Sequence, residues 1–186
     1  MVVQYFGDGY FRIASGEATL LIDPPARARA KGGVRLITKI APGSFLPVAR
    51  DEVRFPGEYE LEGWEIEGVS LQDGASTVYA ARREDITMGI FGALRETHLG
   101  EVMEKLGSID IFVCTLPSGK DASFSVAEKA LKALEPPLAI VGAEPREASR
   151  IMEKFNSRAE QLEKVTVKRK DLTEGERLLV LTPLAK

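Results

Sequence analysis

The stretch Ile109-Asp110-Ile111-Phe112-Val113-Cys114 is an almost unbroken apolar run in the middle of the second half of the chain. A strand this apolar has no wet face, so the run predicts a strand that is covered on both sides. Apolar residues recur at helical spacing on either side of it, over residues 99–106, where Gly107 ends the pattern, and over residues 124–134. The run therefore predicts a sheet with helices packed against it.

The same arrangement continues towards the end of the sequence. Residues 138–141 predict another short buried strand, and Pro145 begins a third stretch with helical spacing. Residues 165–169 and 178–181 predict the last two strands. Strands that alternate with helices in this way favour helices on both outer faces of the sheet material.

The first half of the chain instead has the period of two that is typical of strands. Residues 2–6, 10–14 and 18–22 predict short strands separated by glycine-containing turns. Residues 58–67 alternate glutamates with apolar side chains around Gly63, which predicts a hairpin with one buried and one wet face. Residues 77–81 and 86–91 predict a further strand pair.

Composition predicts one soluble globular domain spanning residues 1–186. The hydrophobic fraction is 44%, the charged fraction is 28%, and the net charge of −3 argues against nucleic acid as a partner. The single cysteine, Cys114, cannot form an internal disulfide. The start of the chain lacks the pattern of a signal peptide, and no apolar run is long enough for a membrane helix. We therefore expect a cytoplasmic protein that does not bind membranes.

Several short motifs, in the same order along nearly the whole chain, resemble a known family. These are Tyr5-Phe6-Gly7-Asp8-Gly9-Tyr10-Phe11-Arg12-Ile13, Leu20-Leu21-Ile22-Asp23-Pro24, Phe55-Pro56-Gly57-Glu58-Tyr59-Glu60, Ile90-Phe91-Gly92-Ala93-Leu94 and Leu106-Gly107-Ser108-Ile109-Asp110. Together they resemble metallo-β-lactamase-fold proteins, in particular the metal-dependent hydrolases related to L-ascorbate-6-phosphate lactonase. The resemblance implies an α/β fold of the αββα type, a four-layer sandwich.

The resemblance does not extend to the metal ligands. The segment Leu36-Ile37-Thr38-Lys39-Ile40-Ala41-Pro42-Gly43-Ser44 stands where the family carries Thr-His-x-His-x-Asp-His, and the only histidine, His98, lies elsewhere. Asp8 replaces a histidine of the opening motif, and Ala93 stands at a further ligand position. Alanine, glycine and protonated lysine side chains have no lone pair for a metal. The comparison therefore implies that no metal is bound at the ancestral site, that no cofactor is present and that no catalytic residue is retained.

The residues that the resemblance brings to the old pocket are candidates for weak ligand binding. Asp8, Asp23 and Glu144 could form a carboxylate-only Mg²⁺ or Ca²⁺ site, or the aspartates could bond loop amides at strand ends. Lys39 could bind a small anion with help from a basic loop, or that loop could simply be solvated. The full set of candidates is Asp8, Asp23, Lys39, Ser44 and Glu144, and the basic loop contributes Arg27, Arg29, Lys31 and Arg35.

Other catalytic chemistry finds little support in the sequence. There is no Gly-x-Ser-x-Gly motif, and His98 lies outside the apolar stripe of its predicted helix. Cys114 has no recognisable histidine partner. Residues 118–121 lie between a strand and a helix but lack the upstream glycine of a P-loop.

Three functional hypotheses follow. The first is a pseudoenzyme with a binding, scaffolding or self-association role. The second is a hydrolase of a small phosphorylated or lactone-like substrate that uses a relocated or carboxylate-based metal site. The third, a nucleic-acid-associated protein, conflicts with the net acidity. We also expect that a second copy of the chain is a partner. The homodimer would form through sheet edges or through the apolar segment 42–47.

Overall fold

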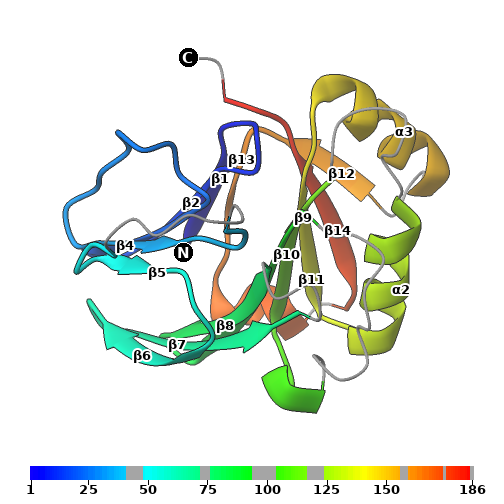
Figure 1. Cartoon of the computed structure of the whole chain (residues 1–186). Helices are drawn as coiled ribbons and strands as arrows, with labels where there is room; N and C mark the ends of the chain where they lie inside the picture. Colours follow the sequence, from blue (N-terminus) through cyan, green and yellow to red (C-terminus); the bar gives the residue numbers. More distant parts are fainter. Residues whose placement is uncertain are drawn as a thin grey trace.

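The structure is a computed structural model that describes residues 1–40, 48–71, 76–93, 104–116, 124–155, 159–173 and 175–184. Two β-sheets lie face to face, and the helices lie on the far side of one of them (Figure 1). This arrangement confirms the mixed α/β sandwich that the sequence predicts. No described helix is both long and apolar enough to cross a bilayer.

The smaller sheet has six strands and contains the N-terminal strand, whereas the last strand of the chain belongs to the larger sheet. The N-terminal strand is its second strand, where Val2 lies opposite Thr166 and also opposite Ala14. Antiparallel pairs lead into a parallel part formed by the last three strands. In spatial order the strands are β13 (Lys164–Thr166), β1 (Val2–Tyr5), β2 (Phe11–Ser15), β3 (Ala18–Ile22), β4 (Gly33–Leu36) and β5 (Glu52–Val53).

The larger sheet has eight strands and is parallel at one end and antiparallel at the other. In spatial order they are β12 (Ala159–Leu162), β14 (Arg177–Leu181), β11 (Leu138–Gly142), β10 (Ile111–Thr115), β9 (Ile86–Ala93), β8 (Thr77–Arg83), β7 (Trp64–Ser70) and β6 (Gly57–Leu61). The apolar run over residues 109–114 contributes most of β10, which lies well inside this sheet. All five of its residues are buried, as a strand covered on both faces requires.

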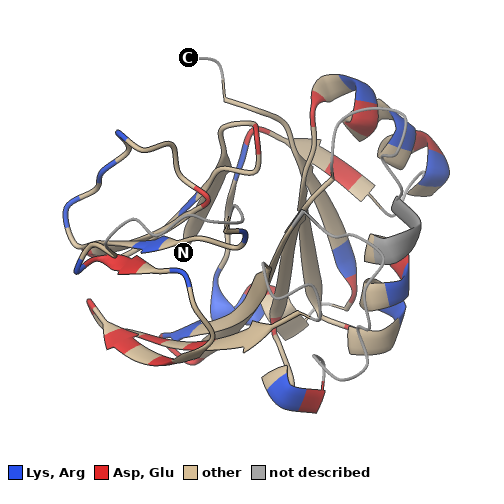
Figure 2. Ribbon diagram, viewed as in Figure 1, with Lys and Arg blue, Asp and Glu red and all other residues tan. Residues whose placement is uncertain are grey.

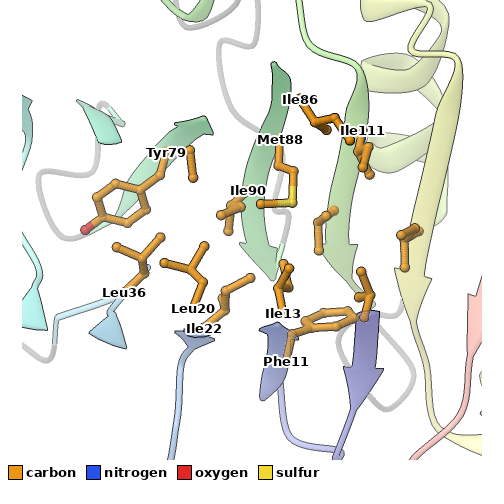
Figure 3. Packing of buried hydrophobic residues seen from close by; sticks show 14 of the residues in the cluster. Phe11, Ile13, Leu20, Ile22, Leu36, Tyr79, Ile86, Met88, Ile90 and Ile111 are labelled. Carbon is orange, nitrogen blue, oxygen red and sulfur yellow. The ribbon is translucent and has the colours of Figure 1, made fainter. Parts of the chain in front are cut away.

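The main core lies between the two sheets. Phe11, Ile13 and Leu20 of the small sheet point towards Met88 and Ile90 of the large sheet (Figure 3). Alternate residues of each strand supply this layer, so the period of two seen in the sequence becomes one apolar face per strand. The core therefore ties the two sheets together without any helix between them.

A second core lies between the large sheet and its helices. These are α2 (Phe124–Leu134) and α3 (Pro145–Phe155), and residues 104–106 are also helical. Phe112 and Val141 of the sheet share a buried cluster with Ala130 and Ile151 of the helices. The sequence favours helices on both outer faces, but among the described residues no helix lies over the outer face of the six-stranded sheet (Figure 1). The loop after β3 covers part of that face instead. Arg35 of β4 donates from Nη1 to Ala28 O of that loop at 2.8 Å.

Several segment boundaries differ from the sequence-based expectation. The last-but-one predicted strand, 165–169, is shorter in the structure, because β13 ends at Thr166 and a 3-10 helix, η2 (Arg169–Thr173), follows. Asp171 causes this change of direction, since its Oδ2 accepts a hydrogen bond from Lys168 N at 2.8 Å. Strands β4, β5 and β12 were not predicted, because each has only two to four residues.

Candidate functional site: the edge of the sandwich beside Asp23

The predicted pocket lies where parallel strands β9, β10 and β11 end, next to the turn between β1 and β2. A Cβ placed on Gly9 of that turn would lie 4.0 Å from Asp23 Cβ and 4.0 Å from Thr115 Oγ1. A Cβ placed on Gly7 would lie 3.3 Å from Glu144 Oε1. The carboxyl ends of parallel strands are the usual position of ligand sites in open α/β sheets. The fold therefore gathers three of the predicted carboxylates near one edge.

Asp23 follows β3 directly, and Thr38 holds its side chain. Thr38 N donates to Asp23 Oδ1 at 2.7 Å, and Thr38 Oγ1 donates to Asp23 Oδ2 at 2.5 Å. Asp23 has a φ of 46°, a left-handed conformation that aspartate tolerates better than most residues. Both carboxylate oxygens thus fasten the segment after β4 to the end of β3. Of the two roles that the sequence allows for Asp23, this is the bonding of a loop amide at the end of a strand.

Burial also changes the acidity of Asp23. Desolvation raises the pKa of its carboxyl above the usual value, and the two hydrogen bonds from Thr38 only partly oppose this. A carboxylate that is costly to ionise and already hydrogen-bonded on both oxygens is a poor anchor for a cation. Among the described residues the structure supplies no buried cation to offset its charge.

Asp8 lies in the β1–β2 turn and Glu144 lies beside that turn, both nearer the surface than Asp23. Asp8 is exposed with a φ of 51°, and Glu144 is partly buried next to Gly7. Burial, together with the charges of Glu144 and Asp8, raises the pKa of Tyr5 to about 12. The Tyr5 hydroxyl accepts a long hydrogen bond, 3.5 Å, from Gly9 N. The electrostatic potential at this edge is therefore negative.

The cations expected at an anion site point elsewhere. Lys39 is exposed and forms an isolated β-bridge with Ser76, and Ser44 lies outside the described residues. Arg35 is 6% exposed and bonded to Glu52, while Arg29 donates to Ala26 O and Ala28 O of its own loop. The described part of the site thus has no cluster of positive charge, and an anion would meet carboxylates first.

The donors present do not fit a transition-metal centre. Among the described residues no three His, Cys, Asp or Glu side chains lie close enough together to hold a metal ion. Asp8, Asp23 and Glu144 are all described, so the structure places them near one edge but not as one chelating group. Zinc and iron centres of hydrolases need histidine nitrogens or several carboxylates with free oxygens. Asp23 is a single carboxylate whose two oxygens each already accept a hydrogen bond from Thr38, which leaves fewer lone pairs for a cation.

One polar group of this edge was not identified from sequence. Thr115 ends β10, is 3% exposed, and its Oγ1 has no hydrogen-bond partner among the described residues. Its position in the sequence could have identified it, because it is the polar residue that ends a buried parallel strand. In the sequence, the neighbouring Cys114 was the candidate nucleophile instead. That thiol is buried, and desolvation raises its pKa far above the usual value, so it is not a nucleophile.

Three solved structures resemble this chain over nearly its whole length. A Thermotoga maritima protein, described as a Zn-dependent hydrolase of the metallo-β-lactamase superfamily, has a TM-score of 0.71 at 17% identity, over 97% of this chain and 98% of that one. The metallo hydrolase Igni18 from the archaeon Ignicoccus hospitalis has a TM-score of 0.58 at 13% identity, over 98% and 95%. The metallo-β-lactamase fold protein YhfI from Bacillus subtilis has a TM-score of 0.55 at 8% identity, over 97% and 94%.

These likenesses show the fold of the chain, which is the metallo-β-lactamase fold. No protein-family model matches the sequence, and no curated protein matches it. The neighbours are described as hydrolases in two of the three cases. Their identities of 8–17% carry no residue role over to this chain.

The raised pKa of Asp23 predicts a pH dependence of stability. Because the folded state holds the proton more tightly than the unfolded state, the stability due to this group is present below about pH 3.8 and is lost as pH rises through the folded pKa. We therefore expect the free energy of unfolding of the wild type to fall relative to Asp23→Asn between pH 3.5 and 7. Urea unfolding of both proteins across this range measures the difference.

The control for that experiment is Asp85→Asn, which also removes one carboxylate from a left-handed residue but at an exposed turn. A trend of the opposite sign, with the wild type gaining stability as pH rises, would mean that a cation compensates Asp23 in the folded protein. That result would contradict the site described above.

Proposed function

We propose that this protein is a non-catalytic metallo-β-lactamase-fold protein that lacks the metal centre and acts by binding. We also propose that it derives from the hydrolase branch related to L-ascorbate-6-phosphate lactonase, on the order of its sequence motifs. The observation that carries the proposal is the pair of hydrogen bonds from Thr38 to Asp23. They turn a carboxylate near the pocket into a structural clamp.

The residue types at the ancestral ligand positions support the same conclusion. Lys39, Ala41 and Gly43 stand where the family resemblance places metal ligands, and none has a side-chain lone pair to donate at neutral pH. Lys39 is also exposed and forms an isolated β-bridge with Ser76. Loss of several ligands together removes binding, because a metal held by one or two groups exchanges readily with water.

Metal binding provides the direct test. We expect protein purified without chelator, then incubated with Zn²⁺, Mn²⁺ or Fe²⁺ and desalted, to hold well below about 0.1 metal ion per chain by elemental analysis. We also expect no rise in Tm with these metals, because a ligand that binds only the folded state would stabilise it. A metal-dependent hydrolase of the same fold with an intact histidine motif, carried through the same steps, is the control. One tightly bound ion per chain would overturn the proposal.

The alternative is a hydrolase that uses a carboxylate-based site for a small phosphorylated or lactone-like substrate. Thr115 Oγ1 has no hydrogen-bond partner in the described part of the chain, and this favours some polar ligand at this edge, since a buried hydroxyl without a partner is costly. Hydrolysis of generic phosphate esters or lactones that depends on added Mg²⁺ and disappears in Asp23→Asn would favour this alternative. Asp85→Asn, in the exposed turn between β8 and β9 and outside this set of carboxylates, is the matched control.

A further inference from the structure

Strand β6 forms one edge of the eight-stranded sheet, and no described residue pairs with its outer side (Figure 1). The hairpin turn has two residues, Glu62 and Gly63, so the closing pair Leu61 and Trp64 exchanges hydrogen bonds. Bonding alternates along an antiparallel pair. The backbone N–H and C=O groups of Glu58 and Glu60 therefore face outwards, away from β7. A free edge of this kind is a template for another strand.

The outer face at this edge carries an unusual arrangement of charge. Glu58 lies directly opposite Glu67, and Glu60 lies directly opposite Glu65, with all four side chains exposed. Like charges in direct cross-strand positions destabilise a sheet. Among the described residues one ion pair offsets part of this negative charge, between Arg82 and Glu65 at 3.7 Å. Figure 2 shows the acidic residues along β6 and β7.

These side chains line a hollow rather than a flat surface. A groove of about 630 Å³ runs from Glu58 and Glu60 across β7 and β8 to Leu106 and Ser108. The helices cover the outer face nearer β10, as the second buried cluster shows, whereas the four glutamates are left exposed. Side chains of an added strand would therefore have room to lie against the carboxylates.

The inner face of the same edge is apolar and incompletely covered. Tyr59 and Leu61 point to the core side and are only partly buried, while their partners on β7, Ile66 and Trp64, are buried. An apolar side chain from one more strand would cover this margin, because burial of apolar surface is favourable. The edge thus offers charge on one face and apolar surface on the other.

We infer that β6 binds an extended segment of a partner protein as a ninth strand, with Lys or Arg alternating with apolar residues. The basic side chains would lie opposite Glu58 and Glu60, and the apolar ones would cover Tyr59 and Leu61. A second copy of β6 is a poor occupant, since it would bring glutamate against glutamate. This inference does not depend on whether the pocket beside Asp23 binds metal, because the two sites share no residue.

The test uses the full-length protein and two peptides of one composition. The first is Lys-Val-Arg-Val-Lys-Val-Arg, and the control is Lys-Arg-Lys-Arg-Val-Val-Val, which cannot place its charges on one face of a strand. We expect the alternating peptide to bind at least about tenfold more tightly than the block peptide. We also expect the amide hydrogens of Glu58 and Glu60 to exchange at least about tenfold more slowly when it is bound.

Matched variants separate this contact from general attraction to an acidic protein. The double substitution Glu58→Gln with Glu60→Gln should weaken binding by about tenfold, as loss of two cross-strand ion pairs predicts. Glu153→Gln with Glu163→Gln removes the same charge at two exposed positions elsewhere and should leave affinity unchanged. Equal binding of both peptides, no binding, or unprotected β6 amides would each overturn the inference.

Discussion

Replacing Glu52 with alanine is expected to lower the free energy of unfolding by about 3–5 kcal/mol, because the change leaves a buried guanidinium without its carboxylate. Glu52 Oε2 lies 3.3 Å from Arg35 Nε, and Glu52 Oε1 accepts from Arg54 Nε at 2.7 Å. The side chains of Arg35 and Glu52 are 7% and 9% exposed, so water cannot replace the lost partner easily. Urea unfolding followed by circular dichroism measures the effect.

An exposed ion pair of the same kind is the control for Glu52. Glu160 and Arg177 lie 3.6 Å apart with side chains 57% and 40% exposed, so Glu160→Ala should cost at most about 1 kcal/mol. A loss of less than about 1 kcal/mol for Glu52→Ala as well would mean that Arg35 reaches solvent. In that case the loop around Ala28 would not cover the outer face of the six-stranded sheet.

Truncation of Phe112 to alanine should also remove about 3–5 kcal/mol of stability. Phe112 is fully buried between the large sheet and its helices, and its ring lies 4.7 Å from that of Phe91 in a stacked arrangement. The neighbours on a central strand cannot collapse into the space, so the cavity cost adds to the loss of apolar burial. Thermal and urea unfolding of the variant measure the change.

Phe55→Ala removes the same side-chain atoms from a surface position. Phe55 is 49% exposed, and we expect its truncation to change stability by no more than about 0.5 kcal/mol. If Phe112→Ala were equally mild, the cluster under α2 and α3 would be loosely packed. The assignment of β10 as a strand covered on both faces would then be wrong.

The local elements of this fold follow largely from the spacing of apolar residues. Alternation around Gly63 predicts the β6–β7 hairpin and its wet face, and both are observed. The short strands β4, β5 and β12 were not predicted, because a strand of two to four residues depends on pairing with its neighbour. Arg35 N donates to Asp51 O and Ile37 N to Val53 O, and these bonds across the sheet define β5.

The candidate site likewise has one part that the sequence predicts and one part that it does not. Family resemblance placed Asp8, Asp23 and Glu144 at one edge of the sandwich, and they do lie around the same turn. The clamp from Thr38 to Asp23 and the buried hydroxyl of Thr115 could not be read from spacing. Both depend on how β4 and β10 sit beside the turn after β1, which is a contact between segments far apart in the chain. His98, Ser44 and residues 118–121 lie outside the described residues.

By itself the sequence determined the longer strands and helices and which metal-donor side chains are missing, because periodicity and side-chain donors are properties of single residues and their near neighbours. It thereby specified the strands on either side of Gly63 and the absence of metal-donor side chains at Lys39, Ala41 and Gly43. Only the tertiary structure decided that Asp23 is a clamp and that Glu58 and Glu60 line a free edge. Those facts arise from pairing across the sheets, where long-range contacts rather than local pattern set which groups meet.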